Sequence, residues 1–110
     1  MAYDEDLVHR LRELLGDETD VTEKKMFGGH AFLVRRHLCV AASRNGGLLA
    51  RIPPSDTDKA LERPHVELME MRGRTMEGWI TVAPQGLKTK RQLASWVSRS
   101  TAFVKKLPSK

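Results

Sequence analysis

The sequence predicts an α+β fold, a small antiparallel sheet flanked by helices in the order α-β-β-β-β-α-β-β-α. Two observations predict it. Apolar residues recur at helical spacing near both ends of the chain, where helix-capping patterns also occur. Between the two helices lie short runs in which apolar and polar residues alternate, and turn signals separate these runs. This pattern is typical of strands joined by hairpins. Such strands pair antiparallel, so the helices are expected to pack on a face of the sheet.

The size and composition indicate one globular domain over residues 1–110. Hydrophobic residues make up 40% and charged residues 30%, which favours a folded protein over a disordered one. No apolar run is as long as a membrane span, and the acidic start lacks the features of a secretory signal. A cytoplasmic protein without membrane contact is therefore expected. Cys39 is the single cysteine, so a disulfide within the chain is impossible.

The first helix is predicted over residues 4–15. Asp4 can cap it, and two acids in its first turn suit the helix dipole. Its buried face consists of Leu7, Leu11, Leu14 and Leu15. Gly16 stands where the helix would end.

Four short strands are predicted next, at 22–27, 30–35, 37–43 and 48–52. The segment "RNGG", residues 44–47, predicts a hairpin, because Asn-Gly accepts the positive φ of tight turns. The turn at residues 35–37 lacks Gly and Asn, so the register of the two strands that it joins is less defined. His37 is expected near the tip of this turn, in water. Alternation in the third strand would place on one face Leu38, Val40 and Ala42.

The second half of the chain predicts two helices and two strands. Pro53 and Pro54 end the fourth strand, and a capping-box pattern at Ser55 opens a short helix over 56–62. Strands are predicted at "VELMEM", residues 66–71, and "WITVA", residues 79–83, with Gly73 and Gly78 marking turns between them. A second capping box at Thr89 opens the last helix, which Pro108 closes.

The stretch "KKMFGGHAF", residues 24–32, raises the choice between a ligand loop and a turn. A phosphate-binding glycine loop runs into a helix, whereas "HAFLV" after Gly28 and Gly29 is typical of a strand. The glycines are therefore interpreted as a turn or bulge that needs positive φ or close backbone approach. Met26 and Phe27 are expected to insert into the core.

No residue pattern indicates catalysis. Cys39 lies in a predicted strand interior, which disfavours a nucleophile, and there is no nucleophile-elbow motif around a serine. His30, His37 and Cys39 could approach one another, but zinc-site spacings are absent. We therefore expect no enzyme activity, no cofactor and no metal. An enzyme acting on a small molecule is a third and weaker hypothesis, which a deep pocket around His30 and Cys39 would favour.

The net charge of +5 permits contact with nucleic acid, although a solvated mixed surface is the favoured explanation of it. The basic residues that could contact an anion are Arg35, Arg36, Arg72, Arg74, Lys90, Arg91, Lys105 and Lys106. Their effect depends on whether they fall on one side of the fold. Aromatic residues are only 5% of the chain and fit buried positions, so no stacking platform for bases is evident.

Several collinear segments resemble the N-terminal domain of the TfoX/Sxy family, over about residues 3–108. They include "VTEKKMFGGHAFLV", "LCVA", "LLARIPP", "GRTMEGWITVAPQGL" and "WVSRSTAFVKKLP". The structural motif positions of the resemblance are Met26, Phe27, Gly28, Gly29, Gly73, Gly78 and Trp79. The two arginines at the tip of the second hairpin, Arg35 and Arg36, are a local departure that makes this tip unusually basic.

The resemblance implies an α+β fold similar to secretion chaperones and a role like that of bacterial competence regulators. Those proteins act on transcription through a partner regulator, and they carry a C-terminal helical domain that is expected to be absent here. The resemblance supplies no catalytic residues. A regulatory or adaptor module that binds a protein partner, or pairs with itself as a homodimer, is the first hypothesis, and a basic nucleic-acid-binding module is the alternative.

Overall fold

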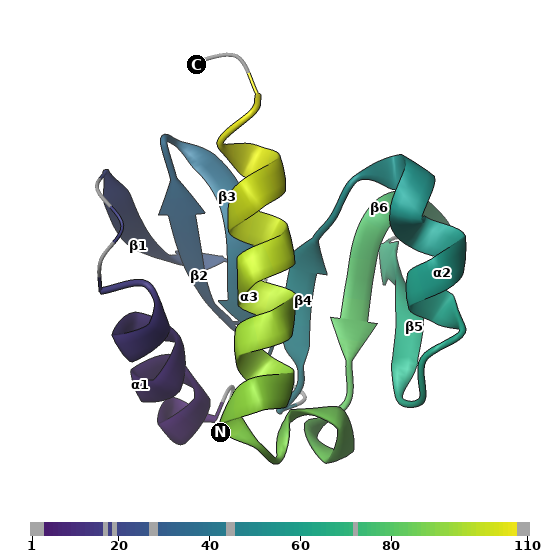
Figure 1. The fold of residues 1–110 in the computed structure, drawn as a ribbon, viewed down its shortest axis with the longest axis horizontal. Coiled ribbons are helices and arrows are strands. Elements are labelled where there is room, and N and C mark those ends of the chain that lie inside the picture. The colour runs from purple at the N-terminus through teal and green to yellow at the C-terminus, as the bar shows by residue number, and fades with distance from the viewer. Residues whose placement is uncertain are drawn as a thin grey trace.

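A computed structural model shows a single antiparallel sheet with its helices on one side. It describes residues 4–16, 18, 20–26, 29–43, 46–71 and 73–107. The helices and 3-10 turns are α1 (Glu5–Leu14), η1 (Pro54–Asp56), α2 (Thr57–Leu61), η2 (Pro84–Leu87) and α3 (Lys90–Val104). The strands are β1 (Val21–Met26), β2 (Gly29–Val34), β3 (His37–Ala42), β4 (Leu48–Arg51), β5 (Val66–Met71) and β6 (Arg74–Val82). The predicted α+β class and element order are confirmed (Figure 1).

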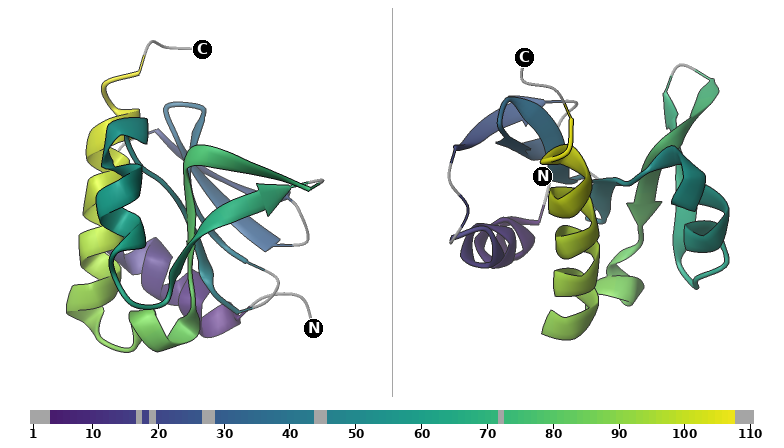
Figure 2. Two further views of the ribbon diagram at one scale, coloured as in Figure 1. Left: turned by 90° about the vertical axis from the view of Figure 1, so that its right-hand side faces the viewer. Right: turned by 45° about the horizontal axis from the view of Figure 1, so that its top comes forward.

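The sheet has six strands in the order β1-β2-β3-β4-β6-β5, and every neighbouring pair is antiparallel. β1 and β5 form its two edges. All three α-helices lie on the same side of this twisted sheet, with α3 across its centre (Figure 2). No helix of the described residues lies over the other side, so among them one sheet face is covered by helices and one is open.

The two long helices begin where their capping residues predict. The Asp4 carboxylate accepts a hydrogen bond of 2.9 Å from the Asp6 backbone N–H. At α3, the Thr89 hydroxyl accepts from the Gln92 N–H and the Gln92 side chain accepts from the Thr89 N–H, so the capping box is complete. These local interactions satisfy donors that a helix start otherwise leaves unpaired.

The main core fills the space between the sheet and the helices. Its largest fully buried members include Phe32, Leu11, Leu48, Ile52, Ile80 and Leu93. β4 alternates as predicted: Leu48 and Ala50 enter this core, while Leu49 faces the other side of the sheet. Burial of this apolar surface is the dominant stabilising contribution to the fold.

The predicted face of the third strand is wrong at Leu38. Phe32 pairs with Val40 but Leu33 pairs with Leu38, so β3 carries a bulge around Cys39. A bulge puts two residues opposite one and breaks the alternation. Cys39 and Val40 both enter the main core, and Leu38 packs on the opposite face of the sheet.

His37 is buried at 6% relative exposure, so the prediction of a solvated position is wrong. Arg35 and Arg36 alone form the turn, with φ of 53° and 70°. The turn is therefore shorter than expected, and His37 becomes the first residue of β3 opposite Val34.

The glycine predictions are confirmed in part. Gly73 has φ of 79° in the turn between β5 and β6, as expected. Gly78 instead lies inside β6, which begins five residues before the predicted 79–83 strand, at Arg74. Its φ of 84° occurs where the β5–β6 register shifts, and a Cβ atom there would lie 3.0 Å from the Ile52 carbonyl oxygen. Gly78 therefore permits a strand irregularity rather than a turn.

The predicted capping box at Ser55 is wrong. A 3-10 turn occupies residues 54–56, and α2 begins at Thr57 with no side-chain hydrogen bond to its cap. The nearby Thr57 hydroxyl accepts a buried 2.9 Å hydrogen bond from the Gly78 N–H instead. This contact ties α2 to the irregular part of β6.

Gly29 belongs to a strand and not to a turn. Met26 pairs with Gly29, so β1 ends and β2 begins at directly opposite residues. A Cβ atom on Gly29 would overlap the Ala42 carbonyl oxygen of β3, which confirms close backbone approach as the reason for a glycine at this position. Phe27, Gly28 and the predicted core insertion of the Met26 side chain lie outside what the structure describes.

Candidate functional site

The open face of the sheet carries an apolar cluster formed by strands alone. Ala31, Ala41 and Leu49 are buried at its centre. Around them pack four partly buried side chains, Leu33, Leu38, Met69 and Trp79. We call this set the open-face cluster. Because it contains no helix residue, it is separate from the main core. Its four partly buried side chains are the apolar surface that it can offer to another apolar surface.

The edges of the open face carry opposite charges. Lys24 on β1 pairs with Ala31 across the ladder, so its side chain shares the face of that alanine. Glu67 on β5 pairs with Thr81, which pairs in turn with Leu49 of the cluster. Both charged residues are exposed. The apolar surface therefore has a cation at one edge and an anion at the other.

Four predicted anion-contact residues gather at the C-terminal end of α3. Arg35 and Arg36 form the β2–β3 turn, and the Arg35 guanidinium donates a 3.2 Å hydrogen bond to the Lys105 carbonyl oxygen. Lys105 and Lys106 follow directly after α3. We call Arg35, Arg36, Lys105 and Lys106 the basic end. Lys105 also pairs with Glu18 at 3.2 Å, which offsets part of its positive charge.

The other predicted basic residues lie elsewhere. Lys90 and Arg91 begin α3, about 20 Å from its last turn at 1.5 Å per residue. Arg74 begins β6 beside the β5–β6 turn. Arg72 lies outside the described residues. The basic residues therefore form separate groups and not one continuous patch.

Arginine–aromatic contacts form a feature that the sequence did not reveal. The Arg63 and Arg99 guanidiniums lie 5.2 and 5.4 Å from the Trp96 ring centroid. The Arg51 guanidinium lies 4.9 Å from the Trp79 centroid and 5.5 Å from that of Phe103. These distances fall within the range of cation–π attraction. Apart from Arg99 and Trp96, which are three residues apart, the partners are distant in sequence. Only the helical spacing of Trp96, Arg99 and Phe103 could have indicated these contacts.

A polar cluster joins α1 to the first two strands. Arg12 donates hydrogen bonds of 2.9 and 2.7 Å to the two Glu23 carboxylate oxygens, and His30 Nε2 lies 2.7 Å from Oε1. The Arg12 hydrogen bonds in particular lower the pKa of Glu23 from 4.5 to about 2. A carboxylate held ionised in this way is a structural anchor, and a poor proton donor at neutral pH.

Cys39 is fully buried in the main core, and this burial raises the pKa of its thiol to about 12. A thiol that stays protonated is a weak nucleophile. In the part of the chain that the structure describes, no group of three or more His, Cys, Asp and Glu residues could hold a metal ion. No described helix is long and apolar enough to cross a membrane.

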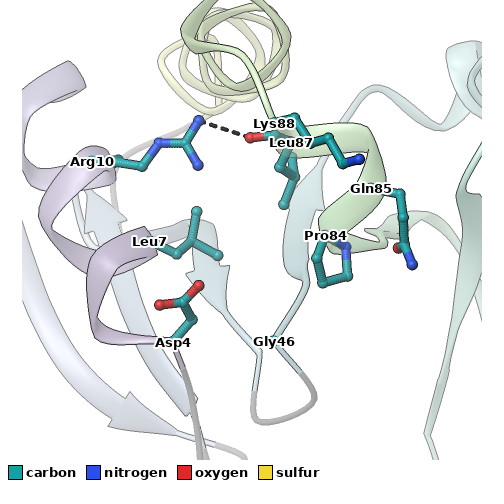
Figure 3. A pocket seen from close by; sticks show the side chains of 8 residues that line it. All are labelled: Asp4, Leu7, Arg10, Gly46, Pro84, Gln85, Leu87 and Lys88. Atoms are coloured by element: carbon teal, nitrogen blue, oxygen red, sulfur yellow. Dashed lines mark hydrogen bonds between the residues drawn. The ribbon is translucent and has the colours of Figure 1, made fainter.

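The largest of three described pockets, of about 480 Å³, opens between α1 and η2 (Figure 3). Arg10 points across it and donates hydrogen bonds of 2.8 and 3.3 Å to the carbonyl oxygens of Leu87 and Thr89. This arginine therefore connects α1 to the approach of α3. Neither His30 nor Cys39 lines any of the three pockets, so the condition for the small-molecule hypothesis is not met by them.

Comparison with known proteins agrees with this fold. The family model of the TfoX N-terminal domain matches residues 13–104, which is most of the chain. The chain belongs to the TfoX N-terminal domain family. No curated protein and no solved structure matches it. The matched range of this TfoX N-terminal domain runs from the last two residues of α1 to the end of α3, so it includes the whole sheet.

Proposed function

We propose that this TfoX N-terminal domain is a non-enzymatic regulatory module that acts by protein–protein contact through its open face. The observation that carries the proposal is the open-face cluster, an apolar surface formed by strands and covered by no helix of the described chain. Family membership supports a regulatory role. A regulator of transcription that works with a partner, as in competence regulation, is the form of that role which the resemblance favours.

The charges at the edges of the open face favour a second copy of the chain as its occupant. A two-fold axis through the centre of the face would place Lys24 of one copy opposite Glu67 of the other, and the reverse. The apolar clusters would then stack as two sheets do in a sandwich, about 10 Å apart. The helical side would remain free in this homodimer to meet a partner regulator.

Sedimentation over a wide concentration range tests the homodimer, with charge reversal as the probe. Lys24→Glu or Glu67→Lys alone should weaken the dimer, because each places like charges together. The double variant should restore it, because the pairs re-form with exchanged signs. Arg91→Glu, at the start of α3, is the matched control and should leave the dimer unchanged. A monomer at every concentration would contradict the proposal.

The basic end favours nucleic-acid binding as a second candidate function. It brings together Arg35, Arg36, Lys105 and Lys106, which lie on two separate segments of the chain. Binding of this kind falls steeply with salt, because phosphate contacts release counterions. Lys105→Glu with Lys106→Glu should abolish it. Absence of any electrophoretic shift of DNA or RNA at low salt would contradict this candidate function.

A further inference from the structure

Three arginines are held on aromatic rings along α3 and its neighbours. Trp96, Arg99 and Phe103 follow one another at helical spacing on one side of α3. Arg63, just after α2, adds a second guanidinium to Trp96, and Arg51, at the end of β4, connects Phe103 to Trp79. We call this set of six side chains the arginine ladder. On α3, Trp96 contacts Arg63 from the segment after α2, and Phe103 contacts Arg51 from the end of β4. Trp79 belongs to the open-face cluster on the other side of the sheet.

No carboxylate of the described residues neutralises the charges of the arginine ladder. Arg51, Arg63 and Arg99 form no ion pair with a carboxylate of the described chain. The described arginines of α1 differ: Arg12 is paired with Glu23, and Arg10 donates to two backbone carbonyls. Ring contacts fix the position of a guanidinium but leave its N–H edges able to donate. The ladder therefore presents oriented, unneutralised donors to solvent.

The ladder suits a phosphate-bearing ligand better than an acidic peptide. Arg63 and Arg99 are exposed, whereas Trp96 between them is 3% exposed. A peptide ligand usually adds an apolar anchor in a pocket, and none of the three described pockets includes a ladder residue. Phosphate contacts need only oriented cationic donors, and the planar guanidinium fork matches phosphate oxygens in pairs.

The arginine ladder also leads toward the basic end. Phe103, which Arg51 contacts, lies two residues before Lys105, so the two cationic groups lie near the same end of α3. Side chains two residues apart on a helix do not face each other, so the two groups project from different sides of that end. A ligand with a repeated negative charge can contact both groups at once, whereas a single phosphate cannot. The buried or guanidinium-covered rings leave little aromatic surface on which bases could stack, so recognition would depend on the backbone and not on base sequence.

We infer that the arginine ladder is a binding site for the phosphodiester backbone of nucleic acid. This inference goes beyond protein contact and rests on the second candidate function, because it assigns that function to a surface besides the basic end. Arg63, Arg99 and Trp96 lie on the helical side, which the proposed homodimer leaves free, whereas Trp79 lies in the open-face cluster that the homodimer would cover.

Fluorescence anisotropy of a labelled oligo-dT strand and of a labelled duplex, titrated with the full chain at several salt concentrations, tests the site. Arg63→Gln with Arg99→Gln should weaken binding at least about tenfold and reduce the salt slope by about two. Arg63→Lys with Arg99→Lys should bind with an affinity between those of the unmodified chain and the glutamine variant, because charge remains but the guanidinium fork is lost. Lys88→Gln with Arg91→Gln removes the same charge near the start of α3 and should change affinity far less. Thermal unfolding checks that each variant is folded.

Each other outcome overturns the inference in a distinguishable way. Equal losses in the ladder and control variants would show that only net charge matters. Loss of nucleic-acid binding in the Lys105→Glu/Lys106→Glu variant but not in the ladder variant would support the second candidate function and assign it to the basic end alone. No binding by the unmodified chain would remove both. Displacement by polyglutamate as readily as by unlabelled oligo-dT would assign the ladder to acidic protein segments instead.

Discussion

Gly29 of β2 packs directly against the backbone of Ala42 in β3, so that a Cβ atom at position 29 would overlap the Ala42 carbonyl oxygen. The two strands pair from the adjacent residue onward, through His30 and Ala42. Strand separation here is therefore limited by a backbone contact that only glycine allows. The glycine is needed for sheet packing, because its φ is not in the left-handed region.

Gly29→Ala should destabilise the fold by about 1–3 kcal/mol, because the added methyl group must push two strands apart. Urea unfolding followed by circular dichroism measures the change. Gly73→Asn is the contrasting variant: Gly73 also sits at a strand end but has open space around it, and Asn tolerates its φ of 79°. An effect of Gly29→Ala no larger than that of Gly73→Asn would contradict the packing argument.

The elements of the fold could be predicted where the signal is local. Asp4 and Thr89 cap the helices that follow them, and Gly46, the third residue of "RNGG", has φ of 93°. The failures depend on contacts between distant segments. Gly78 resembles a turn glycine in sequence, but its place in β6 follows from Ile52 and Thr57, which no local pattern connects to it.

Glu23 should make stability depend on pH in acid. Its pKa is lowered in the folded state to about 2 by Arg12 above all, with His30 adding a further hydrogen bond, while an unfolded glutamate titrates near 4.5. A lowered folded pKa contributes stability that is complete above the unfolded pKa. That contribution is lost as the pH falls from about 4.5 toward 2.

Glu23→Gln should therefore cost about 1 kcal/mol at neutral pH, a value reduced by solvent screening because the Glu23 side chain is 33% exposed. The difference from the unmodified chain should shrink as the pH is lowered below 4.5. Urea unfolding at a series of pH values measures it. Glu13→Gln removes a 3.6 Å pair between α1 and Lys90 of α3, whose side chains are 75% and 76% exposed, and should change little. A pH-independent cost at position 23 would refute the ionic explanation.

Thr57 and Gly78 supply the next prediction. The Thr57 hydroxyl accepts the Gly78 N–H at 2.9 Å in a buried setting, and Thr57 is 4% exposed. Thr57→Val keeps the shape but leaves a buried N–H without an acceptor, which should cost about 1–3 kcal/mol in the free energy of unfolding. Thr57→Ser keeps the acceptor and should cost less. The reverse order of the two variants would show that the methyl group matters more than the hydrogen bond.

The candidate binding surfaces were only partly predictable for a related reason. Arg35 and Lys105 are recognisable as basic residues, but their hydrogen bond joins segments that lie 70 residues apart in the sequence. The open-face cluster depends on the bulge around Cys39, which turns Leu38 away from Val40. Alternation alone assigns Leu38 to the main core. The side chains that share a surface made by several strands can thus be predicted only when the register of those strands is known.

The turn at Arg35 and Arg36 gives a prediction that separates stability from function. Both residues have φ in the left-handed region, at 53° and 70°, as the two central positions of a type I′ turn require. Asn-Gly adopts this conformation at lower cost, whereas other residues pay roughly 1 kcal/mol each. Arg35→Asn with Arg36→Gly should therefore raise stability by about 1 kcal/mol, even with the hydrogen bond to Lys105 lost.

Thermal unfolding measures the gain, and anisotropy with labelled oligo-dT measures binding on the same sample. A more stable variant that binds the strand less tightly would show that the arginines are kept for contact with the anion. A less stable variant would show instead that the arginine side chains hold the turn in place.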